Sequence, residues 1–375
     1  MMLFGHQKDR IAEFDTVYHV LESMADLVSV LDEDGRYIYA NRAMIQKIGR
    51  SPVGTYFDDA SNYLLGFSSV PNVRHTKSTV VREERIDDEY YSVTTSPVLY
   101  EDGRIQAFVE VYHDISAKIN LTIDLVNTNR KMSDDIQFAR SIQKKILPES
   151  MDMGNVHFKA QYFPSERLSG DFYDIIAVDD HRFVFYIADV MGHGVTASMM
   201  TIFVRQTMRS LIHEDPTPNV VLEGLRDAFC ELDLGDSNYF TLFYCLYDTH
   251  TGELCHTNAG HSAMPLVYND KKAEFIRQPG VPVSPVFRAI SYKNASMTLK
   301  TGDHVLLYTD GVTETVNIEG EQFGEERLLS LVQGAEEDIL RMILQNVTRF
   351  RWGEMQDDIA LILMRIDEKG VELCN

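Results

Sequence analysis

Hydrophobic and polar positions divide the chain into three regions with different periods. In the first, between about residues 12 and 115, short apolar runs alternate with polar turns. Residues 11–24 have the spacing of a short amphipathic helix, and Asp32-Glu-Asp-Gly35 is a turn of the kind that joins hairpin strands. We therefore expect a hairpin, short helices from Asn41 onward and a three-stranded meander. The expected strands are residues 28–31, 37–39, 78–86, 90–99 and 105–112.

The second region is a long stretch without helix breakers. Residues 113–147 contain neither proline nor glycine, and two rows of side chains recur every seven residues. Interleaved heptad rows predict a coiled coil over residues 116–147, and hence a homodimer, whereas the alternative is a single amphipathic helix on a domain surface. Asn129 and Gln143 would be polar residues in the contact seam between the two helices, where they lower the stability of a coiled coil but fix the register of its helices. The rows are Leu125, Met132, Ala139 and Ile146, and Thr122, Asn129, Ile136 and Gln143.

The third region, about residues 150–370, mixes long apolar runs with helical patterns. The runs are nearly continuous, which is typical of strands covered on both faces. They lie at residues 183–187, 240–247, 304–308 and 359–364, with helical patterns at 195–212, 220–232 and 336–350. Stacked sheets flanked by helices fit this mixture, so we expect an α+β protein. Its domains would be residues 12–115 and 150–370, joined by the linker at 116–147.

Composition narrows the classes of function. Of 375 residues, 44% are hydrophobic, and 57 acidic against 35 basic side chains give a formal charge of −22. This balance argues against nucleic acid and anionic membranes, which are bound through cationic side chains. The four cysteines show no CxxC spacing, and the polar N-terminus lacks the apolar core of a signal peptide. No run approaches the roughly 18 apolar residues of a membrane span, so we expect a cytoplasmic location.

The informative chemistry is a set of aspartates at the ends of the apolar runs. Asp189 lies in the Ala188-Asp-Val-Met-Gly-His-Gly194 segment that directly follows one run. Asp310 follows another run, Asp357 precedes a third, and Asp171 lies in a Ser-Gly-Asp-Phe-Tyr-Asp segment. Strand ends let a rigid sheet hold several carboxylates around one point, which is what hard divalent cations require. Two cations at such a site can activate a water for attack on phosphorus and neutralise the phosphoryl charge.

A single aspartate before glycine is more often a turn residue than a ligand. Four of them, each beside a predicted buried strand, are much harder to explain as turns. Other phosphate chemistries lack their motifs, because the chain has no Cys-x5-Arg loop, no GxxxxGK[ST] loop and no kinase HRD/DFG set. A metal-dependent phosphotransfer or hydrolysis site is therefore the favoured interpretation.

Five motifs carry a family resemblance. In order, they are Ser169-Gly-Asp-Phe-Tyr-Asp174, Asp189-Val-Met-Gly-His-Gly194, Asn258-Ala-Gly-His261, Tyr308-Thr-Asp-Gly-Val-Thr-Glu314 and Asp357-Asp-Ile-Ala-Leu361. Together they resemble the bacterial branch of the PPM (PP2C-like) phosphatases, the SpoIIE/RsbU/RsbP group. Residues 136–148 are similar to that group's N-terminal signature, and residues 12–115 resemble a PAS sensor domain. A PAS domain joined through a helical linker is most similar to the RsbP branch.

The resemblance implies an αββα sandwich that hydrolyses phosphoserine or phosphothreonine with two Mn²⁺ or Mg²⁺ ions. Asp189 would bridge both ions, with the backbone carbonyl of Val190 completing one shell. Asp171 would act at one ion directly or through water, and Asp310 and Asp357 would hold the other. The implied substrate is a phosphorylated STAS-type anti-sigma-factor antagonist, and a protein or small molecule could act as activator at the PAS domain.

Several residues depart from the family's pattern or stay open. His193 is displaced relative to the histidine of eukaryotic relatives, so we expect a turn role and assign no general acid. His261 is a candidate for lining the site, Asp174 for supporting it, and Asp358 for a role at the start of its strand. The PAS region has no cysteine for a flavin adduct, and His75 and His113 are only nominal haem ligands.

Two other functions compete with the phosphatase. A pseudophosphatase that captures a phosphoprotein without hydrolysis would be favoured by the loss of one acid, but all four are present. A sensor kinase would need a phospho-accepting histidine on the linker helix, and residues 114–156 contain none.

Overall fold

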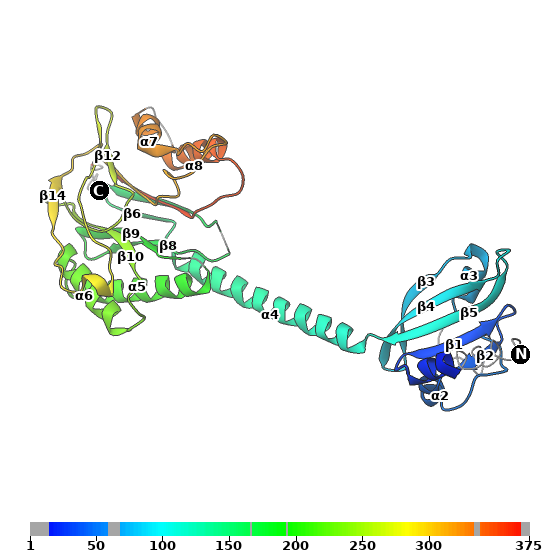
Figure 1. The fold of residues 1–375 in the computed structure, drawn as a ribbon. Coiled ribbons are helices and arrows are strands. Elements are labelled where there is room, and N and C mark those ends of the chain that lie inside the picture. The colour runs from blue at the N-terminus through cyan, green and yellow to red at the C-terminus, as the bar shows by residue number, and fades with distance from the viewer. Residues whose placement is uncertain (1–14, 59–67, 166, 193, 334–337, 369–375) are drawn as a thin grey trace, which may run out of the picture. The chain divides into compact units, whose positions relative to one another are not determined.

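The computed structural model describes residues 15–58, 68–165, 167–192, 194–333 and 338–368. The start of the expected helix at 11–24 and His193 lie outside these ranges, while residues 15–23 are helical. The chain forms two compact units, Met1–Lys131 and Met132–Asn375 (Figure 1). Among the described residues, no helix is both long enough and apolar enough to cross a membrane.

The first unit is built on one antiparallel sheet in the order β2-β1-β5-β4-β3. Its core lies on one face of the sheet, where α2 and α3 cover large side chains such as Phe108 and Tyr112. The elements are β1 Leu27–Asp32, β2 Tyr37–Ala40, α2 Arg42–Ile48, α3 Val70–Thr76, β3 Val80–Ile86, β4 Glu89–Leu99 and β5 Ile105–Asp114. The predicted order of hairpin, short helices and three-stranded meander is confirmed.

Local chemistry explains the turns of this unit. The Asp32 carboxylate accepts hydrogen bonds from the backbone of Asp34 and Arg36, which closes the predicted hairpin turn. Asn41 caps α2 by accepting from the Met44 backbone at 3.0 Å. The hairpin turn at Asp32 and the helix start at Asn41 therefore lie where the sequence predicts them.

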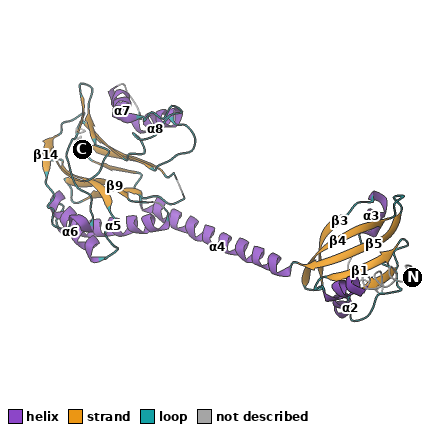
Figure 2. Cartoon of the chain, viewed as in Figure 1, coloured by secondary structure: helices purple, strands orange, loops and turns teal. Residues whose placement is uncertain are grey.

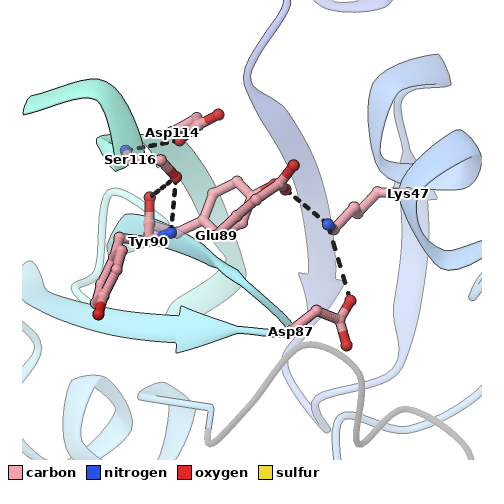
Figure 3. A network of polar contacts seen from close by, with 7 residues as sticks. Lys47, Asp87, Glu89, Tyr90, Asp114 and Ser116 are labelled. Atoms are coloured by element: carbon pink, nitrogen blue, oxygen red, sulfur yellow. Dashed lines mark hydrogen bonds and ion pairs between the residues drawn. The ribbon is translucent and has the colours of Figure 1, made fainter. Parts of the chain in front are cut away.

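A polar network fixes the start of the long helix α4, Ser116–Ile146 (Figure 3). The Ser116 hydroxyl accepts from the backbone N–H of Tyr90 at 2.8 Å, and the Asp114 carboxylate accepts from the Ser116 N–H at 2.8 Å. On the same strand as Tyr90, Glu89 pairs with Lys47 of α2 at 2.6 Å. The first turn of α4 is thereby tied to β4 of the first unit's sheet.

The second unit stacks two antiparallel sheets between two layers of helices (Figure 2). One sheet has the order β14-β11-β10-β9-β8, and the other has β13-β12-β15-β16-β7-β6. Its strands are β6 Ser150–Met153, β7 Val156–Phe163, β8 Asp171–Ala177, β9 Arg182–Val190, β10 Phe240–Asp248, β11 Glu253–Ala259, β12 Leu266–Tyr268, β13 Ala273–Phe275, β14 Ala295–Thr298, β15 His304–Tyr308 and β16 Ile359–Ile366.

Helices cover the outer face of each sheet. The helices α5 Val195–Glu214 and α6 Pro218–Glu231 pack on the first sheet, and α7 Gly324–Gln333 and α8 Ile339–Phe350 pack on the second, with a short 3-10 turn η2 at Pro285–Phe287. The central strands β9, β10, β15 and β16 are buried along almost their whole length, as their apolar runs predicted. The expected αββα sandwich is confirmed.

Candidate active site

Two pairs of predicted acids lie at the ends of neighbouring strands. Asp171 begins β8 and is the cross-strand partner of Asp189 near the end of β9. In the other sheet, Asp310 follows β15 and Asp357 precedes β16, and these two strands are also paired. Thr309 joins the two strand ends, since its backbone N–H donates to the Ala360 carbonyl at 3.1 Å and its hydroxyl accepts from the Ala360 N–H at 3.0 Å.

The acids of the two sheets act on one another electrostatically. Burial, and then the nearby charges of Asp310 and Asp357, raise the pKa of Asp189 to about 7. Burial also raises the pKa of Asp357 to about 6, with a further contribution from Asp310. The structure therefore brings Asp171, Asp189, Asp310 and Asp357 to one edge of the sandwich, and their role as metal ligands stays a prediction.

Asp171 is the most deeply placed of the four. It is 2% exposed, and burial followed by the Asp189 charge raises its pKa well above the usual range. Its Oδ2 atom is buried and has no hydrogen-bond partner among the described residues. A buried, unpartnered carboxylate oxygen beside other carboxylates is costly unless a cation accompanies it.

Within the described residues, no three histidine, cysteine or acidic side chains form a ready-made metal cage. The donor set consists of oxygens alone, which suits Mg²⁺ or Mn²⁺ better than zinc.

Two glycines allow the strand ends to approach each other. A side chain at Gly170 would place its Cβ 2.5 Å from the Val190 carbonyl oxygen, the same carbonyl that the family resemblance makes a metal ligand. A Cβ at Gly311 would lie 2.0 Å from the Asp358 carbonyl. Both distances are shorter than any real contact, so the Gly-Asp and Asp-Gly pairs of the motifs are required by packing around the acids.

Asp358 has a structural role. Its Oδ1 accepts from the backbone and hydroxyl of Ser165 at 2.6 and 2.8 Å, and its Oδ2 accepts from the Gly170 N–H at 3.2 Å. These bonds anchor the segment before Asp171 to the start of β16. The prediction of a role at the start of the strand is confirmed.

His261 and Asp174 both form hydrogen bonds that hold parts of the second unit together. His261 is buried, with Nε2 3.0 Å from the Tyr308 carbonyl and Nδ1 3.3 Å from the Thr241 hydroxyl, and burial lowers its pKa. Asp174 lies on the opposite face of β8 from Asp171 and accepts from Arg209 of α5 at 2.7 and 2.9 Å. Asp174 therefore joins α5 to the sheet, on the face of β8 away from Asp171.

Sequence reasoning missed three residues close to the acids. Ser262 donates to Oδ2 of Asp310 at 3.4 Å. Glu314 has a pKa raised by burial and by the Asp310 charge. Gln143 of α4 donates to the Ser169 carbonyl at 2.8 Å, two residues before Asp171. The Asp-Gly-Val-Thr-Glu motif could have indicated Glu314, but no local signal indicates the other two.

This architecture defines the class: a PP2C-type phosphatase fold joined to a PAS domain. The Stage II sporulation protein E (SpoIIE) family matches residues 179–367, about half of the chain, and the PAS fold matches residues 21–119. The chain belongs to the SpoIIE family. Asp189, Asp310 and Asp357 lie inside the matched segment, whereas Asp171 precedes it.

Similar proteins include two curated phosphatases of Bacillus subtilis (strain 168). Phosphoserine phosphatase RsbP is 29% identical over 50% of this chain and 46% of its own length, and phosphoserine phosphatase RsbU is 24% identical over 68% of this chain and 80% of its own. The chain thus spans about half of RsbP. The SiaA-PP2C domain of Pseudomonas aeruginosa superposes with a TM-score of 0.57 at 19% identity, covering 64% of this chain and 98% of that domain, which supports the fold.

Proposed function

We propose that this protein is a metal-dependent protein phosphatase that removes phosphate from phosphoserine or phosphothreonine. The observation that carries the proposal is the approach of four acids from two stacked sheets. Three of them, Asp171, Asp189 and Asp357, have raised pKa values, and Asp171 has one buried, unpartnered carboxylate oxygen. Such an arrangement is unfavourable by itself and becomes favourable when divalent cations neutralise it.

Each acid has a distinct proposed role. Asp189 would contact two ions, with the Val190 carbonyl and Asp171 beside one of them. Asp310 and Asp357 would hold the other from the second sheet. When bound, Mn²⁺ or Mg²⁺ ions supply an activated water and neutralise charge on the phosphoryl group. The chain positions these ligands on rigid strand ends, and we assign no general acid.

The similarity to RsbP and RsbU supports a proposal for the substrate and the regulation. Both relatives carry the name phosphoserine phosphatase. We propose a phosphorylated STAS-type anti-sigma-factor antagonist as substrate, in a partner-switching pathway of the cytoplasm. The PAS domain would receive a protein or small-molecule signal, and a homodimer formed through α4 would pass it to the phosphatase unit.

The proposal is tested by measuring phosphate release from serine-phosphorylated STAS proteins of the same cell, with Mn²⁺ and with or without candidate activators. Asp310→Asn should abolish turnover, whereas Asp236→Asn, an exposed aspartate remote in sequence from the motifs, should leave turnover unchanged. Binding of the phosphoprotein without any release, in the presence of Mn²⁺, would assign the chain to phosphoprotein capture instead.

A further inference from the structure

A cleft separates the last turns of α4 from the first strands of the phosphatase sheets. Its volume is about 550 Å³, within the range of roughly 300–1,000 Å³ that small-molecule sites occupy. All its lining residues belong to the second unit. The cleft lies beside the strand that leads to Ser165, and none of the four proposed metal ligands lines it.

The walls of the cleft are largely aromatic and aliphatic. Tyr162 and Tyr173 form an edge-to-face pair with ring centroids 6.4 Å apart, and Phe163 beside them is 44% exposed. Leu147 and Ala160 complete the apolar surface. Flat apolar walls of this kind favour an aromatic or similarly flat occupant.

One lining residue carries a polar atom that the described protein leaves unsatisfied. The Gln161 side-chain oxygen is buried and has no hydrogen-bond partner within the described ranges. Buried polar groups are nearly always paired, so this unpaired acceptor points to a missing partner. The Gln161 oxygen requires that this partner donate a hydrogen bond.

The rim of the cleft is positively charged although the whole chain is strongly acidic. Arg140 and Lys144 line it, and neither forms an ion pair with another described residue. Lys144 lies in the last turn of α4, where a cation also favours the helix dipole. Arg140 precedes that turn, so the dipole does not account for it. Glu149 is the one acid among the described lining residues, which leaves a net positive rim.

We propose that this cleft is a binding site for a small amphipathic anion with an aromatic body and a hydrogen-bond donor. The aromatic walls would enclose the body, Arg140 and Lys144 would attract the charge, and the Gln161 oxygen would accept the donor's hydrogen. The site is independent of the proposed phosphatase activity, since binding is measured without turnover.

Occupancy of the cleft would reach the catalytic segment through one side chain. Gln143 lines the cleft and is 2% exposed. The same Gln143 bonds to both the carbonyl and the N–H of Ser169, at 2.8 and 3.3 Å, in the segment that leads to Asp171. A ligand in the cleft therefore contacts a side chain that supports the backbone beside the proposed metal ligands.

The test uses the full chain and the dye 8-anilinonaphthalene-1-sulfonate, which combines aromatic rings, a sulfonate and an N–H donor. Fluorescence and calorimetric titrations should show a saturable site. Arg140→Gln with Lys144→Gln should weaken it by about three- to ten-fold, the effect of two partly screened charges. Ala160→Phe, which fills the cleft, should remove it. The matched control is Arg130→Gln with Lys131→Gln, the same charge change earlier on the same helix.

The outcomes separate cleanly. Loss of the site in Ala160→Phe and weakening only in the Arg140/Lys144 variant support the proposal. Unchanged dye binding in both, or equal weakening by the Arg130/Lys131 control, overturns it. Should Ala160→Phe fail to fold, the comparison of the two charge variants still decides. A change of molecular mass in the Arg140/Lys144 variant with undiminished dye binding would assign the cleft to contact between protein chains, and would also overturn the proposal.

Discussion

At the scale of single residues, the acids of the site destabilise the folded protein when no cation accompanies them. Asp189 illustrates the effect because its pKa rises from an ordinary value of 3.8 to about 7 on folding. Between these values the folded state binds more protons than the unfolded state. The stabilisation of the folded state by protonated Asp189 is therefore intact near pH 4 and is lost as the pH rises towards 7.

We predict that Asp189→Asn stabilises the metal-free protein at pH 8 by on the order of 2 kcal/mol relative to the wild type, because the variant carries no charge to repel Asp310 and Asp357. The difference should shrink as the pH falls to 4. Urea unfolding in the presence of a chelator at both pH values measures it, with the exposed Asp236→Asn as control. A pH-independent difference would contradict the repulsion that we infer.

The ion cluster on the other face of β8 should behave in the opposite way. Asp174 is fully buried between Arg205 and Arg209, so its removal leaves cations without a counter-charge. We predict that Asp174→Asn destabilises the protein by roughly 3 kcal/mol at neutral pH, at the lower end for buried pairs because Arg209 is 41% exposed. Urea unfolding measures this difference in the free energy of unfolding. A decrease below about 1 kcal/mol would show that the Asp174 ion cluster does not stabilise the fold.

Strand-end aspartates could be predicted because periodicity reveals where each buried run stops. The partners of those aspartates could not, because they come from distant parts of the chain. Asp358 anchors Ser165 and Gly170 across more than 180 residues, and Gln143 reaches Ser169 from the linker. Such contacts depend on the stacking of the two sheets, which leaves no local pattern in the sequence.

At the scale of elements, the heptad pattern of α4 predicts a helix but does not determine what that helix packs against. The helix runs from Ser116 to Ile146 as expected, and the side chains of its proposed seam at Leu125 and Met132 are each 57% exposed. Gln143, predicted as a polar seam position, is buried against the phosphatase unit instead. Any two-stranded coil would therefore lie towards the N-terminal side of Gln143.

We predict that the full-length protein is a dimer by light scattering and that Asn129→Leu changes basal activity without altering metal affinity. A leucine at a seam position strengthens and re-registers a coil. Asn127→Leu, two residues earlier and off both seams, should leave mass and activity unchanged. A monomeric protein with normal regulation would rule out the coil and leave the phosphatase proposal untouched.

At the scale of the whole molecule, the chain forms two units with separate cores. The PAS order and the sandwich could be predicted from strand order and apolar runs, because those patterns reflect burial on one face or both. The domain limits at 12–115 and 150–370 stay a prediction.

Divalent cations should bind and stabilise only the phosphatase unit. We predict that EDTA abolishes activity, that Mn²⁺ or Mg²⁺ restores it, and that zinc serves less well, because the proposed shell contains only oxygen. In calorimetry, Mn²⁺ should raise the unfolding temperature of the phosphatase unit and leave the transition of the PAS unit in place. Full activity after exhaustive chelation would contradict the metal site.

The central claim, that Asp189 organises a metal-dependent phosphatase site, is tested most directly by one measurement. Phosphate release from a serine-phosphorylated STAS protein is compared between wild type and Asp189→Asn at saturating Mn²⁺, with circular dichroism to establish that both are folded. The variant should retain less than about a tenth of wild-type turnover, because a ten-fold loss corresponds to only about 1.4 kcal/mol of transition-state stabilisation. Turnover above that level in a folded variant would contradict the claim.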